Sequence, residues 1–156
     1  MAEKVLIVYY SFSGNTENLA KAIHAKVGGE IFKLQPEVPY AGDYNKITEQ
    51  AKKEIQEGFH PPLKTKVDNV EGYDKIFVGS PNWWNTIAPP LATFLAENNL
   101  SGKTILPFYT HGGGGSGSIE RDVTKLCGRS KVKPGLSFYG NDISDSQIGT
   151  WLKDMV

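Results

Sequence analysis

Apolar residues gather in five short runs that are rich in Val, Ile, Tyr and Phe and are separated by longer mixed stretches. The runs cover residues 4–10, 30–35, 74–80, 103–109 and 132–139. The first, third and fourth show no clean alternation of apolar and polar positions, which is typical of strands buried on both faces of a sheet. We therefore predict a β-strand at each run.

Between these runs, apolar residues recur at the three- and four-residue spacing of one helix face. The spacing predicts five helices, built around Leu19, Ile23 and Val27; Ile47, Ala51 and Ile55; Leu91, Phe94 and Leu95; Ile119, Val123 and Leu126; and Ile148, Trp151, Leu152 and Met155. Residues that favour helix ends flank three of them: Asp43, Gly58, Pro89, Pro90, Ser144 and Gln147.

The alternation of strands and helices predicts one α/β domain over residues 1–156, a doubly wound parallel sheet with helices on both faces. No linker or internal repeat divides the chain. The stretch 36–73 contains several Pro, Gly and Asn residues, so we expect it to be irregular around a single helix.

The charge balance narrows the classes of partner. The chain has 17 Lys and Arg against 17 Asp and Glu, so no overall field attracts nucleic acid or an anionic membrane. The first apolar run is shorter than a signal-peptide core and no later run could span a bilayer, so we expect a cytoplasmic protein. The one cysteine, Cys127, stands on the apolar side of a helix, which predicts a buried, unreactive thiol.

The loop SFSGNT, residues 11–16, leads directly from the first strand into a helix. Backbone N–H groups at a helix start bind phosphate, and the hydroxyls of Ser11, Ser13 and Thr16 can add further donors. The loop has no Lys or Arg, and it lacks the Gly-Lys-Ser or Gly-Lys-Thr of loops that bind ATP or GTP. It therefore fits a terminal phosphate held by neutral donors; the alternative is a simple turn and helix cap.

Two further loops follow the third and fourth strands. The stretch GSPNWWNTIAPP, residues 79–90, holds two adjacent tryptophans, and we expect one indole in the core and one on an aromatic ligand. The stretch THGGGGSGS, residues 110–118, contains a formal G-x-G-x-x-G, but it follows the penultimate strand, whereas a dinucleotide fingerprint follows the first. Its glycines let a planar ring approach the backbone closely, and His111 either assists there or simply faces solvent.

Together the three loops resemble those of the flavodoxin family, which binds FMN where the strand order reverses. The resemblance covers nearly the whole chain and implies a five-stranded sheet in the order 2-1-3-4-5. It implies that the phosphate is held by Ser11, Ser13, Gly14, Asn15 and Thr16, and that Phe12 in the same loop also binds the cofactor. It implies that the flavin ring is bordered by Pro81, Asn82, Trp83, Trp84 and Asn85, and that its pyrimidine edge meets Thr110, His111, Gly112 and Gly113.

The chain departs from the family's electron carriers in two ways. Those carriers are strongly acidic, whereas this chain is balanced. They also place an aromatic residue from the loop after strand four over the outer flavin face, and here that loop offers only Gly, Ser and one His. The outer face is then either open, so that it admits a nicotinamide or a quinone, or covered by Tyr40 or Tyr44.

We therefore expect an FMN-binding oxidoreductase that passes electrons from NAD(P)H to a quinone or a similar acceptor. The flavin performs the chemistry, so no catalytic acid or base and no metal site is expected. One alternative is an electron carrier that docks to a redox protein partner. Another is a flavin-free regulatory domain, which would need an acidic cluster at the end of the first strand, where Tyr9, Tyr10 and Ser11 stand.

Overall fold

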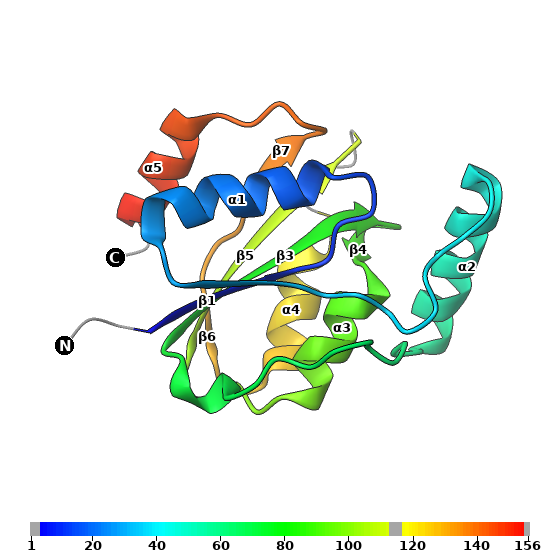
Figure 1. The fold of residues 1–156 in the computed structure, drawn as a ribbon, viewed down its shortest axis with the longest axis horizontal. Coiled ribbons are helices and arrows are strands. Elements are labelled where there is room, and N and C mark those ends of the chain that lie inside the picture. The colour runs from blue at the N-terminus through cyan, green and yellow to red at the C-terminus, as the bar shows by residue number, and fades with distance from the viewer. Residues whose placement is uncertain (1–3, 113–116, 155–156) are drawn as a thin grey trace.

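The computed structural model describes residues 4–112 and 117–154, and its centre is a parallel β-sheet (Figure 1). The strand order is β2-β1-β3-β5, with two short strands, β6 and β7, paired to the far side of β5. The strands are β2 (Glu30–Lys33), β1 (Val5–Tyr9), β3 (Lys75–Trp83), β5 (Thr104–His111), β6 (Lys131–Val132) and β7 (Leu136–Tyr139). The predicted order is confirmed, although the number of strands differs from five.

The difference arises partly because the last predicted strand is divided in two. β6 pairs with the start of β5 and β7 with its end, while the residues between them leave the ladder. Pro134 has no N–H to donate, and the N–H of Gly135 donates instead to the carboxylate of Glu120. The Pro134 carbonyl accepts a 2.9 Å hydrogen bond from Nε1 of Trp151, so this break is tied to the last helix.

Four helices cover the two faces of the sheet, as predicted (Figure 1). On one face α1 (Asn15–Val27) and α5 (Asp145–Asp154) bury Leu19, Ile23 and Trp151 against the sheet. The opposite face packs against α3 (Pro89–Glu97) and α4 (Ile119–Cys127). Cys127 is buried there, and burial raises the pKa of its thiol to about 11, in agreement with the expected unreactive cysteine.

The remaining long helix, α2 (Tyr44–Glu57), stands apart from the other four, beyond the carboxyl ends of β1 and β3 (Figure 1). The carboxylate of Asp43 caps it by accepting a 2.8 Å hydrogen bond from the N–H of Lys46. Gly58 ends it in the left-handed conformation at φ 66°. Both end signals were predicted. Among its side chains that the structure describes, only that of Ala51 is fully buried.

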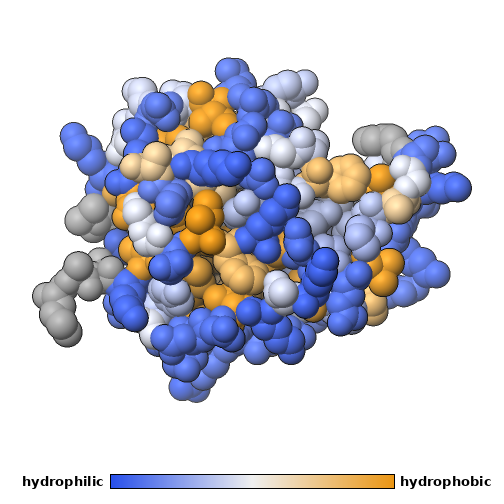
Figure 2. Space-filling view, in the orientation of Figure 1, coloured by the Kyte–Doolittle hydropathy of each residue, from blue (hydrophilic) through white to orange (hydrophobic). Residues whose placement is uncertain are grey.

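The rest of the stretch 36–73 is largely irregular, as expected. Its other ordered features are a single bridge between Pro36 and Leu63 and a one-turn 3-10 helix, η1 (Val70–Gly72). Figure 2 shows hydrophilic residues over most of one face, with hydrophobic residues gathered in smaller areas near its middle. Within residues 4–112 and 117–154, no helix has the length and apolar character needed to cross a membrane.

Candidate cofactor site

The three loops singled out in the sequence follow neighbouring parallel strands, so they meet at one edge of the sheet. The N–H of Tyr10, just past β1, donates a 3.0 Å hydrogen bond to the carbonyl of Gly79 in β3. Pro81 near the end of β3 lies opposite Thr110 near the end of β5. This is the edge at which open parallel sheets bind ligands.

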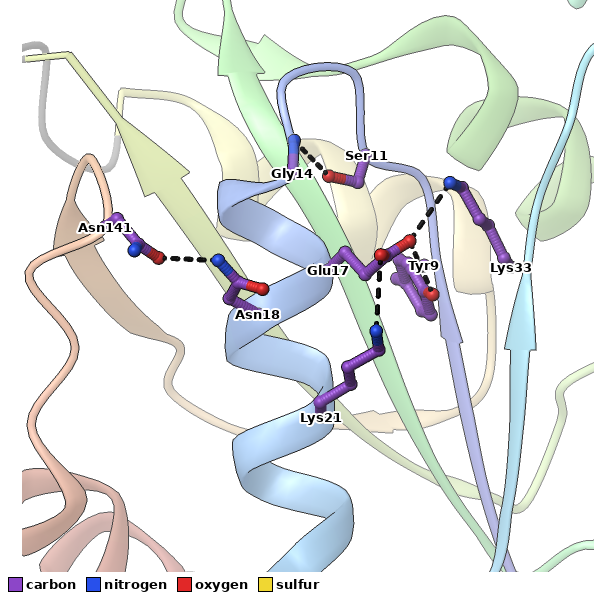
Figure 3. Close-up of polar contacts among 8 residues, drawn as sticks. All are labelled: Tyr9, Ser11, Gly14, Glu17, Asn18, Lys21, Lys33 and Asn141. Atoms are coloured by element: carbon purple, nitrogen blue, oxygen red, sulfur yellow. Dashed lines mark hydrogen bonds and ion pairs between the residues drawn. The ribbon is translucent and has the colours of Figure 1, made fainter.

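The first loop closes on itself before α1 begins (Figure 3). The hydroxyl of Ser11 accepts a 3.1 Å hydrogen bond from the N–H of Gly14, which is left-handed at φ 100°. Helix α1 then begins at Asn15 without a side-chain cap, so its first N–H groups are available to an anion. Ser13 is exposed beside them.

A buried pair of hydroxyls joins the first loop to the third. The hydroxyl oxygens of Thr16 and Thr110 lie 2.8 Å apart, and both side chains are almost completely buried. Either hydroxyl can donate to the other. The one that accepts keeps a hydrogen that it can direct elsewhere. The pair therefore fixes the distance between the two loops and still supplies one donor.

A charged cluster supports the start of α1 (Figure 3). The carboxylate of Glu17 accepts hydrogen bonds from Lys33 at 3.0 Å, Lys21 at 3.4 Å and the hydroxyl of Tyr9 at 3.2 Å. The hydrogen bond from Lys33 is the main cause that lowers the pKa of Glu17. Burial, with a smaller effect of Glu17, raises the pKa of Tyr9 to about 12. Two ammonium groups against one carboxylate leave a surplus positive charge at this helix start.

The second loop is more regular than the sequence indicated. Residues Asn82 and Trp83 of β3 pair with Ile87 and Thr86 of a short antiparallel strand, β4 (Thr86–Ile87). Trp84 and Asn85 form the turn at φ 55° and 68°, a region that few side chains other than Asn adopt readily. We call residues 82–87 the tryptophan hairpin.

The two indoles of this hairpin lie in different surroundings. Trp83 packs on the core, with its ring centroid 5.6 Å from that of Tyr10, 5.2 Å from Tyr40 and 6.1 Å from Phe12. Trp84 is 47% exposed. We expected one indole in the core; Trp83 packs against the core but is only partly buried. The expected contact of an indole with a ligand stays a prediction.

The hydroxyl of Tyr40 donates a 2.5 Å hydrogen bond to Glu54 of α2. Together with the packing on Trp83, this bond holds the buried Tyr40 ring beneath the tryptophan hairpin. The side chain of Tyr44, the other residue considered as a cover for the flavin, lies outside the described residues.

The third loop packs against the tip of the hairpin. The N–H of Ser118 donates a 2.6 Å hydrogen bond to the carbonyl of Asn85, and a Cβ on Gly117 would lie 2.6 Å from that same oxygen. His111 packs edge-on to the ring of Tyr139, with centroids 5.9 Å apart, and Gly112 is exposed. Gly113, also a predicted contact of the flavin, lies outside the described residues.

Three residues at this edge were not identified from the sequence. Glu17 organises the charged cluster, Tyr139 lies exposed at the end of β7, and Asn141 accepts a 3.0 Å hydrogen bond from Asn18 of α1 (Figure 3). The loop after the fifth strand also lies at the carboxyl edge of the sheet. The same rule that selected the other loops could have found Tyr139 and Asn141.

The donors and rings at this edge fit FMN. An uncapped helix start, the hydroxyls of Ser11 and Thr16, and a surplus positive charge suit a phosphate. The half-exposed rings of Phe12 and Trp84 offer surface to an isoalloxazine ring.

Comparison with known proteins gives the same result. A family model described as flavodoxin matches residues 4–155. An NAD(P)H dehydrogenase (quinone) from Azorhizobium caulinodans is 28% identical over 93% of this chain and 77% of its own length. A candidate flavoprotein from Bacteroides eggerthii has a TM-score of 0.88 at 30% identity, covering 99% of this chain and 98% of the other. A flavoprotein from Lactobacillus acidophilus in complex with FMN has a TM-score of 0.78 at 25% identity, covering 97% and 99%. The likeness extends over the whole fold.

Proposed function

This chain belongs to the flavodoxin family, and from that premise we propose that it is an oxidoreductase that passes electrons from NAD(P)H to a quinone. FMN is its cofactor. In the balanced reaction, NAD(P)H, one proton and a quinone give NAD(P)⁺ and a hydroquinone. The chemistry that FMN supplies when bound is the uptake of a hydride and the release of two electrons to the acceptor.

The residues of this chain bind and orient the cofactor in this proposal. The start of α1 and the hydroxyl of Ser11 hold the phosphate, and the Thr16–Thr110 pair keeps the first and third loops together. The tryptophan hairpin borders the ring. The charged cluster around Glu17 holds the first turn of α1 and contributes positive charge.

The position of Tyr40 is the observation that carries the choice of an enzyme. Its ring is fixed beneath the hairpin by Trp83 and Glu54, and residues 110–118 contain no aromatic side chain other than His111. Hydride transfer needs the donor ring to lie against the flavin at roughly 3–3.5 Å, so a flavin that is covered neither by Tyr40 nor by residues 110–118 favours direct reaction with a nicotinamide. The quinone acceptor is supported by the names of curated relatives such as that from Azorhizobium caulinodans.

Two measurements on the purified protein test the proposal. Absorption spectra should show a flavin at one FMN per chain, and FAD should bind less well because the loop has room for one phosphate. Steady-state assays should show oxidation of NADH or NADPH that depends on added 1,4-naphthoquinone. If the FMN-loaded protein oxidises neither nucleotide with any quinone but takes electrons readily from a flavodoxin reductase, the proposal is wrong and the protein is a carrier.

A further inference from the structure

A cavity of about 590 Å³ lies between α2 and the carboxyl edge of the sheet. We call it the α2 cavity. It is lined by Phe12, Gly42, Ile47, Thr48, Ala51, Asn82, Trp83 and Trp84. Half of these residues belong to the predicted FMN site, and the other half belong to α2 and to the turn before it. In the sequence, Ile47 and Ala51 indicated only the apolar face of a helix and not a binding site.

Trp84 joins the hairpin to α2 and so closes one side of this cavity. Its indole Nε1 donates a 2.9 Å hydrogen bond to the carbonyl of Thr48, and the ammonium of Lys52 lies 5.1 Å from the centre of its ring. The left-handed backbone of Trp84 carries strain, and such strain tends to persist at binding sites. Trp84 is therefore both a residue of the hairpin turn and one wall of the α2 cavity.

The lining resembles that of a small-molecule site. Three aromatic rings and two aliphatic side chains form most of it, and none of the eight lining residues is charged. Phe12 and Trp84 are 49% and 47% exposed, so they present apolar surface that a ligand would cover. Figure 2 shows hydrophobic residues over the loop that leads into α1, on the side facing α2.

This lining favours one class of ligand. A nicotinamide dinucleotide carries a pyrophosphate with two negative charges, whereas none of the eight lining residues is a cation and Lys52 at the edge supplies one positive charge. A flat aromatic ring with carbonyl oxygens suits the apolar walls, and the ammonium of Lys52 at the edge can donate to one of those oxygens. A quinone has this chemistry.

We propose that the α2 cavity binds the quinone acceptor, with Ile47, Ala51 and Lys52 of α2 as residues that determine acceptor specificity. The inference rests on the proposed function, because it names the place of that reaction's second substrate. The α2 cavity shares Phe12, Asn82, Trp83 and Trp84 with the residues predicted to hold FMN. A quinone bound in the α2 cavity would therefore contact residues that are also predicted to contact FMN.

The test uses the full-length, FMN-loaded protein and equilibrium dialysis with 1,4-naphthoquinone. Ala51→Leu places extra volume in the cavity from the α2 side and should weaken naphthoquinone binding by about tenfold or more. Lys52→Met changes an exposed side chain, so the variant should fold like the parent. It should weaken naphthoquinone binding by about two- to fivefold. Lys53→Met is the matched control on the same helix and should leave binding unchanged.

FMN affinity and activity are measured on the same variants. FMN affinity, and the rate of NAD(P)H oxidation with ferricyanide, which needs no aromatic pocket, should match the parent in all three. Naphthoquinone binding that is unchanged in both Ala51→Leu and Lys52→Met would overturn the inference. So would a parallel loss of FMN affinity, which would make the cavity part of the cofactor site, or a loss of NADP⁺ binding in place of naphthoquinone binding.

The outcomes also separate this inference from the proposed function. If the parent protein oxidises no NAD(P)H with any acceptor, yet binds naphthoquinone and loses it in Ala51→Leu, the proposed reaction is wrong and the binding site stands. If every variant oxidises NAD(P)H at the parent's rate with ferricyanide and also with naphthoquinone, the proposed reaction stands and the proposed quinone site is wrong.

Discussion

At the scale of a single residue, the hydroxyl of Ser11 accepts a hydrogen bond from the N–H of Gly14 and keeps its own hydrogen, which in the proposed site it donates to the phosphate. Ser11→Ala removes a donor to a charged acceptor, which costs about 1.5–3 kcal/mol, or roughly ten- to a hundredfold in FMN affinity. Riboflavin lacks the phosphate, so its affinity should hardly change. Titration of the apoprotein with both flavins measures this difference, and an equal loss for both would mean that Ser11 is only structural.

Glu17 is a second single residue with a testable effect, because it makes the free energy of unfolding depend on pH. The pKa of Glu17 is lowered in the folded protein, chiefly by Lys33. The ionised carboxylate therefore stabilises the fold fully above the ordinary glutamate pKa of about 4.3. This stabilisation is lost as the pH falls through the lowered pKa. Glu17→Gln should therefore destabilise the protein at pH 7, by about 1 kcal/mol or less, and this difference should shrink at pH 3. Urea unfolding at both pH values measures it, with exposed Glu49→Gln as the control; a difference that stays constant with pH would contradict the assignment.

At the scale of elements, contact between the third loop and the tryptophan hairpin depends on one glycine. Gly117→Ala places a methyl group 2.6 Å from the carbonyl oxygen of Asn85. Gly140→Ala is a matched control, because Gly140 has φ 51° against 49° for Gly117, but a methyl group there would meet no atom within 4 Å beyond its chain neighbours. Both variants should lose about 1–2 kcal/mol to the left-handed backbone, and Gly117→Ala about 1–3 kcal/mol more through the clash. Equal free energies of unfolding would show that the two loops do not pack together.

The elements also show what a sequence pattern can and cannot predict. Buried strands and helix ends are local, so β1, β3, the cap at Asp43 and the stop at Gly58 were predictable. The turn at Trp84 and Asn85 was not, because such hairpin turns usually carry Asn-Gly and two tryptophans give no turn signal. The periodicity of α2 indicated an apolar face but not its neighbour, so the α2 cavity became visible only in the structure.

At the scale of the whole molecule, the proposed cofactor site joins loops from three strands that are far apart in the chain. A ligand that binds only the folded state stabilises it, by about 2.7 kcal/mol at a free concentration one hundred times Kd. For a chain of 156 residues this corresponds to a rise in Tm of roughly 5–11 °C with FMN. Thermal unfolding with and without FMN measures the rise, and an unchanged Tm would mean that FMN does not bind the folded chain.

Helix α2 packs on the molecule more lightly than the others, since Ala51 is the one fully buried side chain described in it. Its backbone hydrogen bonds can therefore open by local unfolding at a lower free energy than those of the central strands. Amide protons of α2 should then exchange with deuterium well before those of β1, β3 and β5, and a quinone in the α2 cavity should slow that exchange. If the α2 cavity binds the acceptor as proposed, its wall can therefore open locally to admit that molecule while the strands of the sheet stay folded.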